Sequence, residues 1–597
     1  MPTTIEVNKQ SVEALLGSGK SKPFVIPEYQ RPYAWTDEQV ETLFEDLWDF
    51  TATSGGTERE SSYFLGSVVS YENEDGEQEI IDGQQRITSL FLLLRAIYTK
   101  LVATPASERT AEANNFIGKI EPTIWRTNKL TGTVDFKNIL LTSRVVNNEG
   151  NEILRSILET GKADEDAKDN YSKNYRHFQE LFDKHSTENP LMVYQFIYAL
   201  LNQAILLPIT ADTQDTALTI FSTLNDRGLP LSDADIFKAK IYNQLAPDDK
   251  KAFIDRWKDL DEQSTDANES IQQLFYYNMF YYRALDKDTK TTTPGVRKYY
   301  AVNKFERLYK PELLDTLFVI LNLWKVVNKG EELEDEAWSK NIKIRQTLDI
   351  LTSYPNEYWK YPVVIYYVCY RNEENFETRF ARFLNKLLME LMTKYLMIPT
   401  INAVKPDILK LNSAIVASDI PTFEFKTVDM TQLEPYIQNP NRNVVRMLLK
   451  TLAYEHQDDL LPAKWEIEHI FPQKWQTNYF PDEPDATIKE KIEHIGNKLP
   501  FEKKLNIVAG NGYFGKKKKE YIASKIVITK AMGTSDVMDW NLESITKRDI
   551  RVSDEVVKIM NRWNNEYLNI PASEGKAEEP SEEELAQIEK FKKNGWI

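Results

Sequence analysis

Residues 63–98 read YFLGSVVSYENEDGEQEIIDGQQRITSLFLLLRAIY, and this stretch predicts two strands followed directly by a helix. Residues 63–72 and 78–82 have strand-like patterns, and the turn-forming ENEDGE separates them. After the DGQQR motif at Asp82–Arg86, apolar residues recur at helical spacing: Ile87, Leu90, Phe91, Leu94, Ile97 and Tyr98. The first part of the chain is therefore expected to alternate short strands and helices.

The remainder of the chain is predicted to be largely helical. Thr36, with a glutamine three residues on, has the pattern of a capping box, so a helix is expected to start there. Residues 105–200 and 246–450 read as mostly helical, whereas AILLPIT at 204–210 reads as a buried strand. Around Trp465 the pattern changes to short strands and polar loops that end in a lysine-rich helix. We predict a multidomain α+β protein.

Composition narrows the classes of function. The 597 residues are 42% hydrophobic, enough for packed cores, and the single cysteine, Cys369, excludes a disulfide framework and a zinc site built on several thiols. No signal peptide or membrane-spanning run is evident, so a cytoplasmic protein without membrane contact is expected. The net charge of −17 means that nucleic acid would have to bind through a local patch. Residues 498–530 provide one, with nine Lys, no Arg and two Glu.

The DGQQR motif is a candidate phosphate site. A junction from strand to helix offers free backbone N–H groups and the positive end of the helix dipole. Gly83 permits close backbone approach, Arg86 can grip a phosphate, and Gln84 and Gln85 can hydrogen-bond a base, a ribose or a water. The alternative is an ordinary helix N-terminus with Asp82 as its cap.

Two further polar segments have a structural and a functional interpretation. IPEYQRPYAW at 26–35 places aromatic rings beside Arg31, a combination that suits base stacking and phosphate contact, or simply packing. Asn225, Arg227, Asp235 and Lys238 form a polar loop before a helix, in which Ser232 and Asp235 also make sense as a capping pair.

The C-terminal region carries the most specific pattern. WEIEHIFP at 465–472 places Glu468 beside His469, and IGNKL, Asn506 and Lys516–Lys519 follow in order. Hydrolysis of a phosphodiester needs a general base, for which His469 suits, and a divalent ion held by hard oxygen donors, for which Glu468 and Asn506 suit. The lysines can neutralise a DNA backbone. A structural histidine and a solvated lysine face are the alternatives.

This order resembles the ββα-metal (HNH) nuclease motif. The resemblance implies that His469 is the base, that Glu468 and Asn506 hold Mg²⁺ or Mn²⁺, and that Asn497 pins the loop or supports the metal. Family members usually have Asp in the position that Glu468 occupies.

The N-terminal motifs resemble the GmrS half of GmrSD-type modification-dependent restriction enzymes, and the HNH segment resembles the GmrD half. Phosphorothioate-sensing SspE proteins join both halves in one chain. The resemblance implies a ParB/sulfiredoxin-like fold and binding and hydrolysis of GTP or another NTP at Asp82–Arg86. It also implies sensing of modified DNA, either a modified base or a phosphorothioate backbone, by five residues: Tyr29, Gln30, Arg31, Tyr33 and Trp35.

We therefore predict an NTP-regulated, Mg²⁺-dependent DNA endonuclease of anti-phage defence, for which a homo-oligomer is one option of assembly. The expected domains are a GmrS-like domain (1–245), a helical coupling domain (246–450), an HNH domain (451–570) and an acidic linker with a terminal helix (571–597). A non-nucleolytic NTP-gated DNA-binding regulator and an RNA-cleaving toxin are the alternatives.

Overall fold

The computed structural model describes residues 6–54, 61–128, 130–145, 148–224, 233–426, 428–476 and 483–570. The chain is α+β and mostly helical, and it divides into two compact units, Met1–Asp259 and Leu260–Ile597. The predicted nuclease region and the predicted helical region after residue 259 lie in the second unit, whereas residues 246–259 belong to the first. The predicted terminal helix after residue 571 lies outside the described residues.

A mixed sheet of seven strands forms the centre of the first unit. Strands β4 (Tyr63–Glu72) and β5 (Gln78–Asp82) are antiparallel, and β4 and β9 (Ala204–Ala211) are parallel. Strand β2 (Gln10–Ser11) pairs with β9 beside β1 (Glu6–Val7). The strands predicted at 63–72, 78–82 and 204–210 are thereby confirmed. In spatial order the main path is β1, β9, β4, β5, β3 (Phe24–Ile26) and β8 (Leu141–Ser143).

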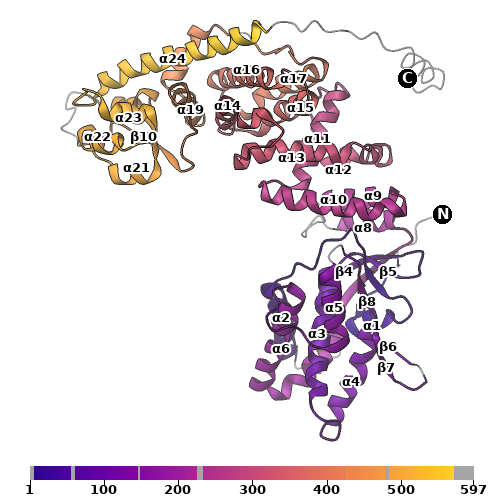
Figure 1. Cartoon of the computed structure of the whole chain (residues 1–597). Coiled ribbons are helices and arrows are strands. Elements are labelled where there is room, and N and C mark those ends of the chain that lie inside the picture. The colour runs from indigo at the N-terminus through magenta and orange to yellow at the C-terminus, as the bar shows by residue number, and fades with distance from the viewer. Residues whose placement is uncertain are drawn as a thin grey trace, which may run out of the picture. The chain divides into compact units, whose positions relative to one another are not determined.

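Helices cover both faces of this sheet (Figure 1). Because strand side chains alternate between faces, Val68 and Ile80 join the larger apolar cluster, whereas Val69 and Ile81 join the smaller one. The larger cluster includes residues of α1 (Val12–Ser18), α2 (Asp37–Ser54), α3 (Gln84–Ala103), α4 (Ala111–Ile124), α5 (Asn148–Thr160), α6 (Asn170–Glu188) and α7 (Val193–Tyr198). The smaller cluster includes residues of α8 (Gln214–Leu224) and α9 (Asp233–Gln244).

Local signals explain where these elements begin. The predicted helix start at Thr36 is confirmed with one half of the capping box, because the backbone N–H of Thr36 donates to Gln39 Oε1 at 2.8 Å immediately before α2. The prediction that residues 105–200 are mostly helical is confirmed by α4, α5, α6 and α7, although strands were not expected there. This stretch also contains β8 and the hairpin of β6 (Trp125–Thr127) and β7 (Val134–Ile139), where Gly132 adopts a φ of +68° in the turn. Only glycine adopts that left-handed conformation readily.

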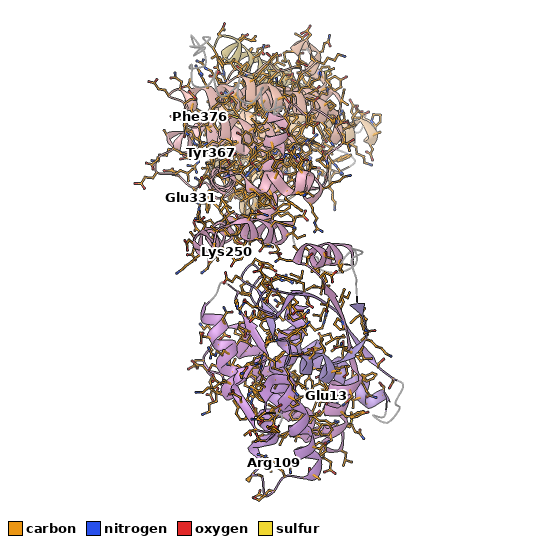
Figure 2. All side chains as sticks on the ribbon, turned by 90° about the vertical axis from the view of Figure 1, so that its right-hand side faces the viewer. Glu13, Arg109, Lys250, Glu331, Tyr367 and Phe376 are labelled. Atoms are coloured by element: carbon orange, nitrogen blue, oxygen red, sulfur yellow. The ribbon has the colours of Figure 1, made fainter. Side chains whose placement is uncertain are left out.

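The second unit begins with a helical, aromatic-rich region, as predicted. Figure 2 labels Tyr367 and Phe376, whose rings lie 6.0 Å apart between α15 and α16. The α-helices of this region are the end of α10 (Pro247–Asp266), α11 (Ile271–Leu285), α12 (Val296–Tyr300), α13 (Leu313–Lys329), α14 (Ile342–Leu351), α15 (Lys360–Tyr370), α16 (Phe376–Met397), α17 (Lys405–Ala417), α18 (Glu434–Gln438) and α19 (Val445–His456).

The C-terminal motif lies on a small two-stranded element. Strand β10 (Trp465–His469) pairs antiparallel with β11 (Lys498–Glu502), and α21 (Lys503–Ala509) follows β11 directly. This confirms the strand expected at Trp465. The remaining helices are α20 (Asp485–Lys491), α22 (Phe514–Ile522), α23 (Val527–Thr534) and the long α24 (Leu542–Leu568), for which no element was predicted. No described helix is both long and apolar enough to cross a bilayer.

Candidate nuclease and nucleotide sites

His469 is the last residue of β10 and lies opposite Lys498 of β11. Its Nε2 is 3.4 Å from Glu493 Oε1 and 3.5 Å from Gln473 Nε2. The imidazole is largely enclosed, with 16% of the side chain exposed. A carboxylate beside a partly accessible imidazole is the arrangement that a general base needs, because the carboxylate stabilises the protonated ring.

The surroundings of His469 favour its neutral form. Burial lowers the pKa of His469 below its ordinary value, and the nearby ammonium of Lys498 lowers it further, while Glu493 raises it. Lys498 also holds Glu493, with its Nζ 2.8 Å from Oε2, and that contact lowers the pKa of Glu493 against the effect of burial. At neutral pH the imidazole is therefore deprotonated and able to accept a proton.

Glu468 points into the interior and already has a cationic partner. Its Oε1 lies 2.8 Å from Lys517 Nζ and accepts a hydrogen bond of 2.6 Å from the Tyr521 hydroxyl. Lys517 also donates to the carbonyl of His469 at 2.6 Å. The assignment of Lys517 to the DNA backbone is therefore corrected, since its side chain is 2% exposed and joins α22 to β10.

Asn497 holds the loop after β10 in place. Its Oδ1 accepts from the Phe471 N–H at 2.7 Å, and its Nδ2 donates to the carbonyls of Phe471 and Ile492, both at 3.0 Å. The residue is fully buried. A side chain whose amide bonds only backbone groups cannot touch substrate, so the catalytic assignment of Asn497 is corrected to a positioning role and its loop-pinning alternative is favoured.

The other three lysines of the run differ from one another. Lys516 and Lys519 are exposed on α22, where they can meet a phosphate backbone. Lys518 donates to the carbonyls of Ser535 and Val537, so much of its donor capacity is used within the protein. Two of the four predicted lysines therefore have the exposure that a DNA contact requires.

The side chains predicted to hold a divalent ion are of the types that Mg²⁺ prefers, but there are only two of them. Glu468 on β10 and Asn506 on α21 offer carboxylate and amide oxygens, and the two elements pack against each other. Across the described residues, no three His, Cys, Asp or Glu side chains are grouped to hold a metal. Mg²⁺ commonly takes one or two protein carboxylates and retains several waters, so a sparse donor set is compatible with it.

The DGQQR motif lies at the predicted junction, where β5 ends at Asp82 and α3 begins at Gln84. Gly83 is the N-cap with a φ of +88°, and no side chain caps the helix. A Cβ on Gly83 would lie 3.1 Å from the carbonyl oxygen of Ser67, so the glycine is needed for both conformation and space. The alternative in which Asp82 is itself the helix cap is therefore not what the structure shows.

Asp82 and Arg86 are both half-buried beside this junction and interact electrostatically. Burial raises the pKa of Asp82, although Gly83, Arg86 and Arg31 each act to lower it. Arg86 donates to the Ser67 carbonyl at 3.0 Å, and burial lowers its pKa. A charged guanidinium next to an uncapped helix N-terminus is an arrangement that binds a phosphate.

The two glutamines of the motif bind the protein's own backbone. Gln85 Oε1 accepts from the N–H groups of Ala34 at 2.7 Å and Trp35 at 3.2 Å, and its Nε2 donates to Pro32 O at 3.1 Å. Gln84 donates to the Arg31 carbonyl at 3.3 Å. The expectation that these amides hydrogen-bond a base or ribose is corrected, because they instead fasten residues 31–35 to the start of α3.

Most of the predicted sensing residues are likewise buried. Tyr29 donates to Glu79 and accepts from Gln214, and Gln30 donates to the Ile81 carbonyl. Tyr33 stacks on Tyr171, 5.0 Å away, and shares a hydrogen bond with Ser89. Direct DNA contact by these three buried residues is thus corrected to support of the segment.

Arg31 is exposed and Trp35 is half-buried, so these two are available to a ligand. In the polar loop, Asn225 and Arg227 lie outside the described residues, and Asp235 and Lys238 are half-buried on α9.

Three site residues had no signal in the sequence strong enough to identify them. Glu493 lies 24 positions after His469 in the chain, and it reaches the imidazole only because β10 and β11 pair. Asp549 of α24 binds the Gly496 N–H and His494 Nδ1, both at 2.8 Å. Arg548 binds the carbonyls of Ile495, Gly496 and Lys498. An adjacent Arg-Asp pair on a helix gives no hint of such distant partners.

Two family models match the chain. Residues 12–242 match the model described as GmrSD restriction endonuclease, N-terminal domain. Residues 429–552 match the model described as GmrSD restriction endonucleases, C-terminal domain. The first match covers the sheet strands β3, β4, β5, β8 and β9 with the DGQQR junction, and the second covers β10, β11 and the first part of α24. No curated protein matches the chain.

Proposed function

The chain belongs to the GmrSD family of restriction endonucleases, and we propose that it cuts DNA with His469 as general base, under the control of a nucleotide and a DNA modification. A restriction endonuclease takes DNA as its substrate. The observation that carries the proposal is the pairing of His469 with Glu493 at the end of β10, within the part that matches the C-terminal family model.

The proposed role of His469 follows from its protonation and position. The Glu493 carboxylate lies 3.4 Å from Nε2 and can only accept, so Nε2 carries the proton of the neutral ring and Nδ1 is the nitrogen that takes a proton from the attacking water; Glu493 then stabilises the imidazolium that results. Lys517 holds the carbonyl of His469, and Asn497 holds the loop that follows, so the ring is fixed from both sides. Proton transfer by a positioned base contributes about 10²–10⁴-fold to rate.

A divalent ion, Mg²⁺ or Mn²⁺, is proposed as the cofactor of this reaction. Glu468 and Asn506 would hold it, since their oxygens are the donors that Mg²⁺ prefers. When bound, such an ion supplies charge stabilisation to the scissile phosphate and the leaving oxygen. The exposed Lys516 and Lys519 are proposed to contact neighbouring phosphates of the DNA.

The first unit is proposed to bind GTP or another NTP at the Asp82–Arg86 junction. The uncapped α3 N-terminus and the Arg86 guanidinium support phosphate binding there. Arg31 and Trp35 are proposed as the DNA-sensing contacts, because they remain accessible in the segment that Gln84 and Gln85 fasten to this junction. A nucleotide at the start of α3 and DNA at residues 31–35 would therefore bind neighbouring segments that are hydrogen-bonded to each other.

The test of the nuclease assignment is relaxation of a supercoiled plasmid by the full chain in Mg²⁺, in Mn²⁺ and in EDTA, on DNA that the protein cuts. His469→Ala is expected to cut about 10²–10⁴-fold more slowly without a change in melting temperature. His177→Ala is the matched control, because that imidazole also lies beside carboxylates, those of Glu41 and Glu180. Cutting by folded His469→Ala at the wild-type rate would rule the proposal out.

A further inference from the structure

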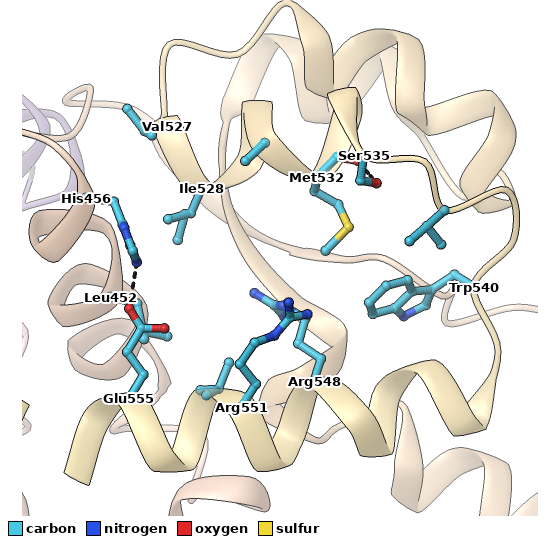
Figure 3. A pocket seen from close by; sticks show the side chains of 13 residues that line it. Leu452, His456, Val527, Ile528, Met532, Ser535, Trp540, Arg548, Arg551 and Glu555 are labelled. Carbon is cyan, nitrogen blue, oxygen red and sulfur yellow. Dashed lines mark hydrogen bonds and ion pairs between the residues drawn. The ribbon is translucent and has the colours of Figure 1, made fainter. Parts of the chain in front are cut away.

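A cavity of about 400 Å³ lies behind the nuclease strands, between α19, α23 and α24 (Figure 3). It shares no residue with the DGQQR junction or with the residues predicted for the HNH site, although Arg548, which holds the backbone beside that site, also lines the cavity. Its walls combine an apolar part, including Ile528, Met532 and Trp540, with charged side chains that rise from α24. Small-molecule sites in proteins have volumes of about 300–1,000 Å³ and this same combination of surfaces.

Two arginines of α24 give the cavity its charge. Arg548 is buried and Arg551 is exposed, and both line the cavity. Burial lowers the pKa of Arg548 to about 10, and the neighbouring positive charge of Arg551 adds to that effect. Among the described residues Arg551 makes no ion pair, whereas the charge of Arg548 is opposed by Asp549 and Glu555, whose carboxylates bind other partners.

The two carboxylates nearest the arginines, Glu555 and Asp549, each have another basic partner. Glu555 lies on the cavity wall and pairs with His456 at 2.6 Å, as the dashed line in Figure 3 marks. Asp549 is buried and pairs with Lys491 at 2.9 Å and with His494 at 2.8 Å. An anion that enters the cavity would therefore meet two guanidinium groups whose carboxylate neighbours already have partners.

The apolar part of the cavity suits a planar ring. The Trp540 side chain is 4% exposed, and its indole N–H has no hydrogen-bond partner among the described residues. Met532 lines the same cavity with a flexible thioether that packs well against aromatic surfaces. An aromatic body placed here would gain stacking and apolar contact.

We propose that this cavity binds a nucleoside monophosphate, with its base against Trp540 and Met532 and its phosphate monoester at Arg548 and Arg551. A free nucleotide and the phosphorylated terminal nucleotide of a DNA strand share this chemistry.

Arg548 links the cavity to the nuclease strands. Its Nη1 donates to the carbonyls of Ile495, Gly496 and Lys498 at 3.1, 2.8 and 2.8 Å, and Lys498 lies opposite His469 in the ladder. A phosphate held by Arg548 would bias the position of this backbone. The binding stands independently of the proposed function, whereas its effect on cutting rests on that function.

Titration calorimetry on the full chain tests the binding, with AMP, GMP, inorganic phosphate and a short 5′-phosphorylated single-stranded oligonucleotide as probes. Arg551→Gln is expected to weaken binding of AMP or GMP at least 10-fold. Lys558→Gln, an equal charge change on the exposed side of the same helix, should leave it unchanged. Inorganic phosphate should bind more weakly, because it lacks the ring. Binding that Arg86→Gln retains and Arg551→Gln loses belongs to this cavity rather than to the DGQQR junction.

Three other results of these experiments would change or overturn the proposal. Binding of the oligonucleotide but not of free nucleotides, lost in Arg551→Gln, would identify a DNA end as the source of the same ligand. Absence of binding by every probe, or binding that Arg551→Gln leaves unchanged, would overturn the site. If AMP or GMP binds through Arg551 and the cutting rate of wild type stays the same, the link through Arg548 is overturned and the binding site stands.

Discussion

The DGQQR junction and the β10–β11 element are each held by a buried side-chain amide, but the accessible groups beside the amide differ. Each uses a buried amide as a clamp on its own backbone, Gln85 in the first and Asn497 in the second. What each clamp leaves accessible differs. The junction leaves an uncapped helix N-terminus beside Arg86, which suits an anion, whereas the strand end leaves His469 beside Glu493, which suits proton transfer. Each motif therefore contains residues that hold the backbone and residues that are available for chemistry, and their burial distinguishes the two kinds.

The largest effect is expected at Lys517. Lys517→Met removes the cation that neutralises buried Glu468, and loss of one partner from a buried pair costs about 3–5 kcal/mol of unfolding free energy. Urea unfolding measures this change. Lys519→Met, on the exposed side of the same helix, should change stability by less than about 0.5 kcal/mol. Equal stability of the two variants would contradict a structural role for Lys517 and restore it as a DNA contact.

Replacement of the two clamps sharpens the comparison. Asn497→Ala leaves the Phe471 N–H and two carbonyls unpaired in a fully buried site, and an unsatisfied buried group costs about 1–3 kcal/mol. Gln85→Ala breaks bonds to a part-buried segment that water can reach, so its cost in unfolding free energy should be smaller. A larger loss in Gln85→Ala than in Asn497→Ala would reverse the assigned roles.

Arg86 tests the chemistry of the junction. A hydrogen bond to a charged group is worth about 1.5–3 kcal/mol, so Arg86→Gln should weaken GTP or ATP binding by roughly 10-fold or more. Calorimetry on the full chain gives the affinity. Arg109→Gln is the matched control, since that guanidinium also donates to backbone carbonyls of the same unit. Unchanged nucleotide affinity in folded Arg86→Gln would remove Arg86 from the site.

The smallest effect concerns Asp82. Because its folded-state pKa is raised, its contribution to stability is fully present below the unfolded pKa and is lost as pH rises through the folded value. Relative to the unfolded chain, the folded protein therefore disfavours the charged form of Asp82. Asp82→Asn should raise the melting temperature slightly at pH 7.5, and the gain should shrink toward pH 4. A lower melting temperature at pH 7.5 would show that burial is not the dominant influence on Asp82.

The sequence predicted those elements whose signals are local. The strand ends at Asp82 and His469, the capping box at Thr36 and the lysine-rich helix all depend on neighbours within a few residues. The hairpin of β6 and β7 was missed, because short strands with polar faces have little periodicity.

The site was only partly predictable for a related reason. His469 and Arg86 were predicted from their residue types. The groups around His469, however, come from β11 and the loop before it. The backbone of that loop is in turn bound by Arg548 of α24. Pairing and packing, rather than spacing along the chain, bring such groups together. For the same reason, nothing in the sequence distinguishes exposed Lys519 from Lys517, which is buried because its ammonium binds Glu468 and the carbonyl of His469 on β10.

The central claim is that the first unit controls cutting by the second, and a matrix of plasmid cleavage rates tests it most directly. Wild-type protein with Mg²⁺ would be given plasmids with glucosylated bases, with phosphorothioate links and without modification, each with GTP, with ATP and with no nucleotide. A differential affinity of about 3 kcal/mol shifts an active state roughly 150-fold, so one modification should change the rate by about that factor in a nucleotide-dependent way. Equal cutting of all three plasmids under every nucleotide condition would contradict the account.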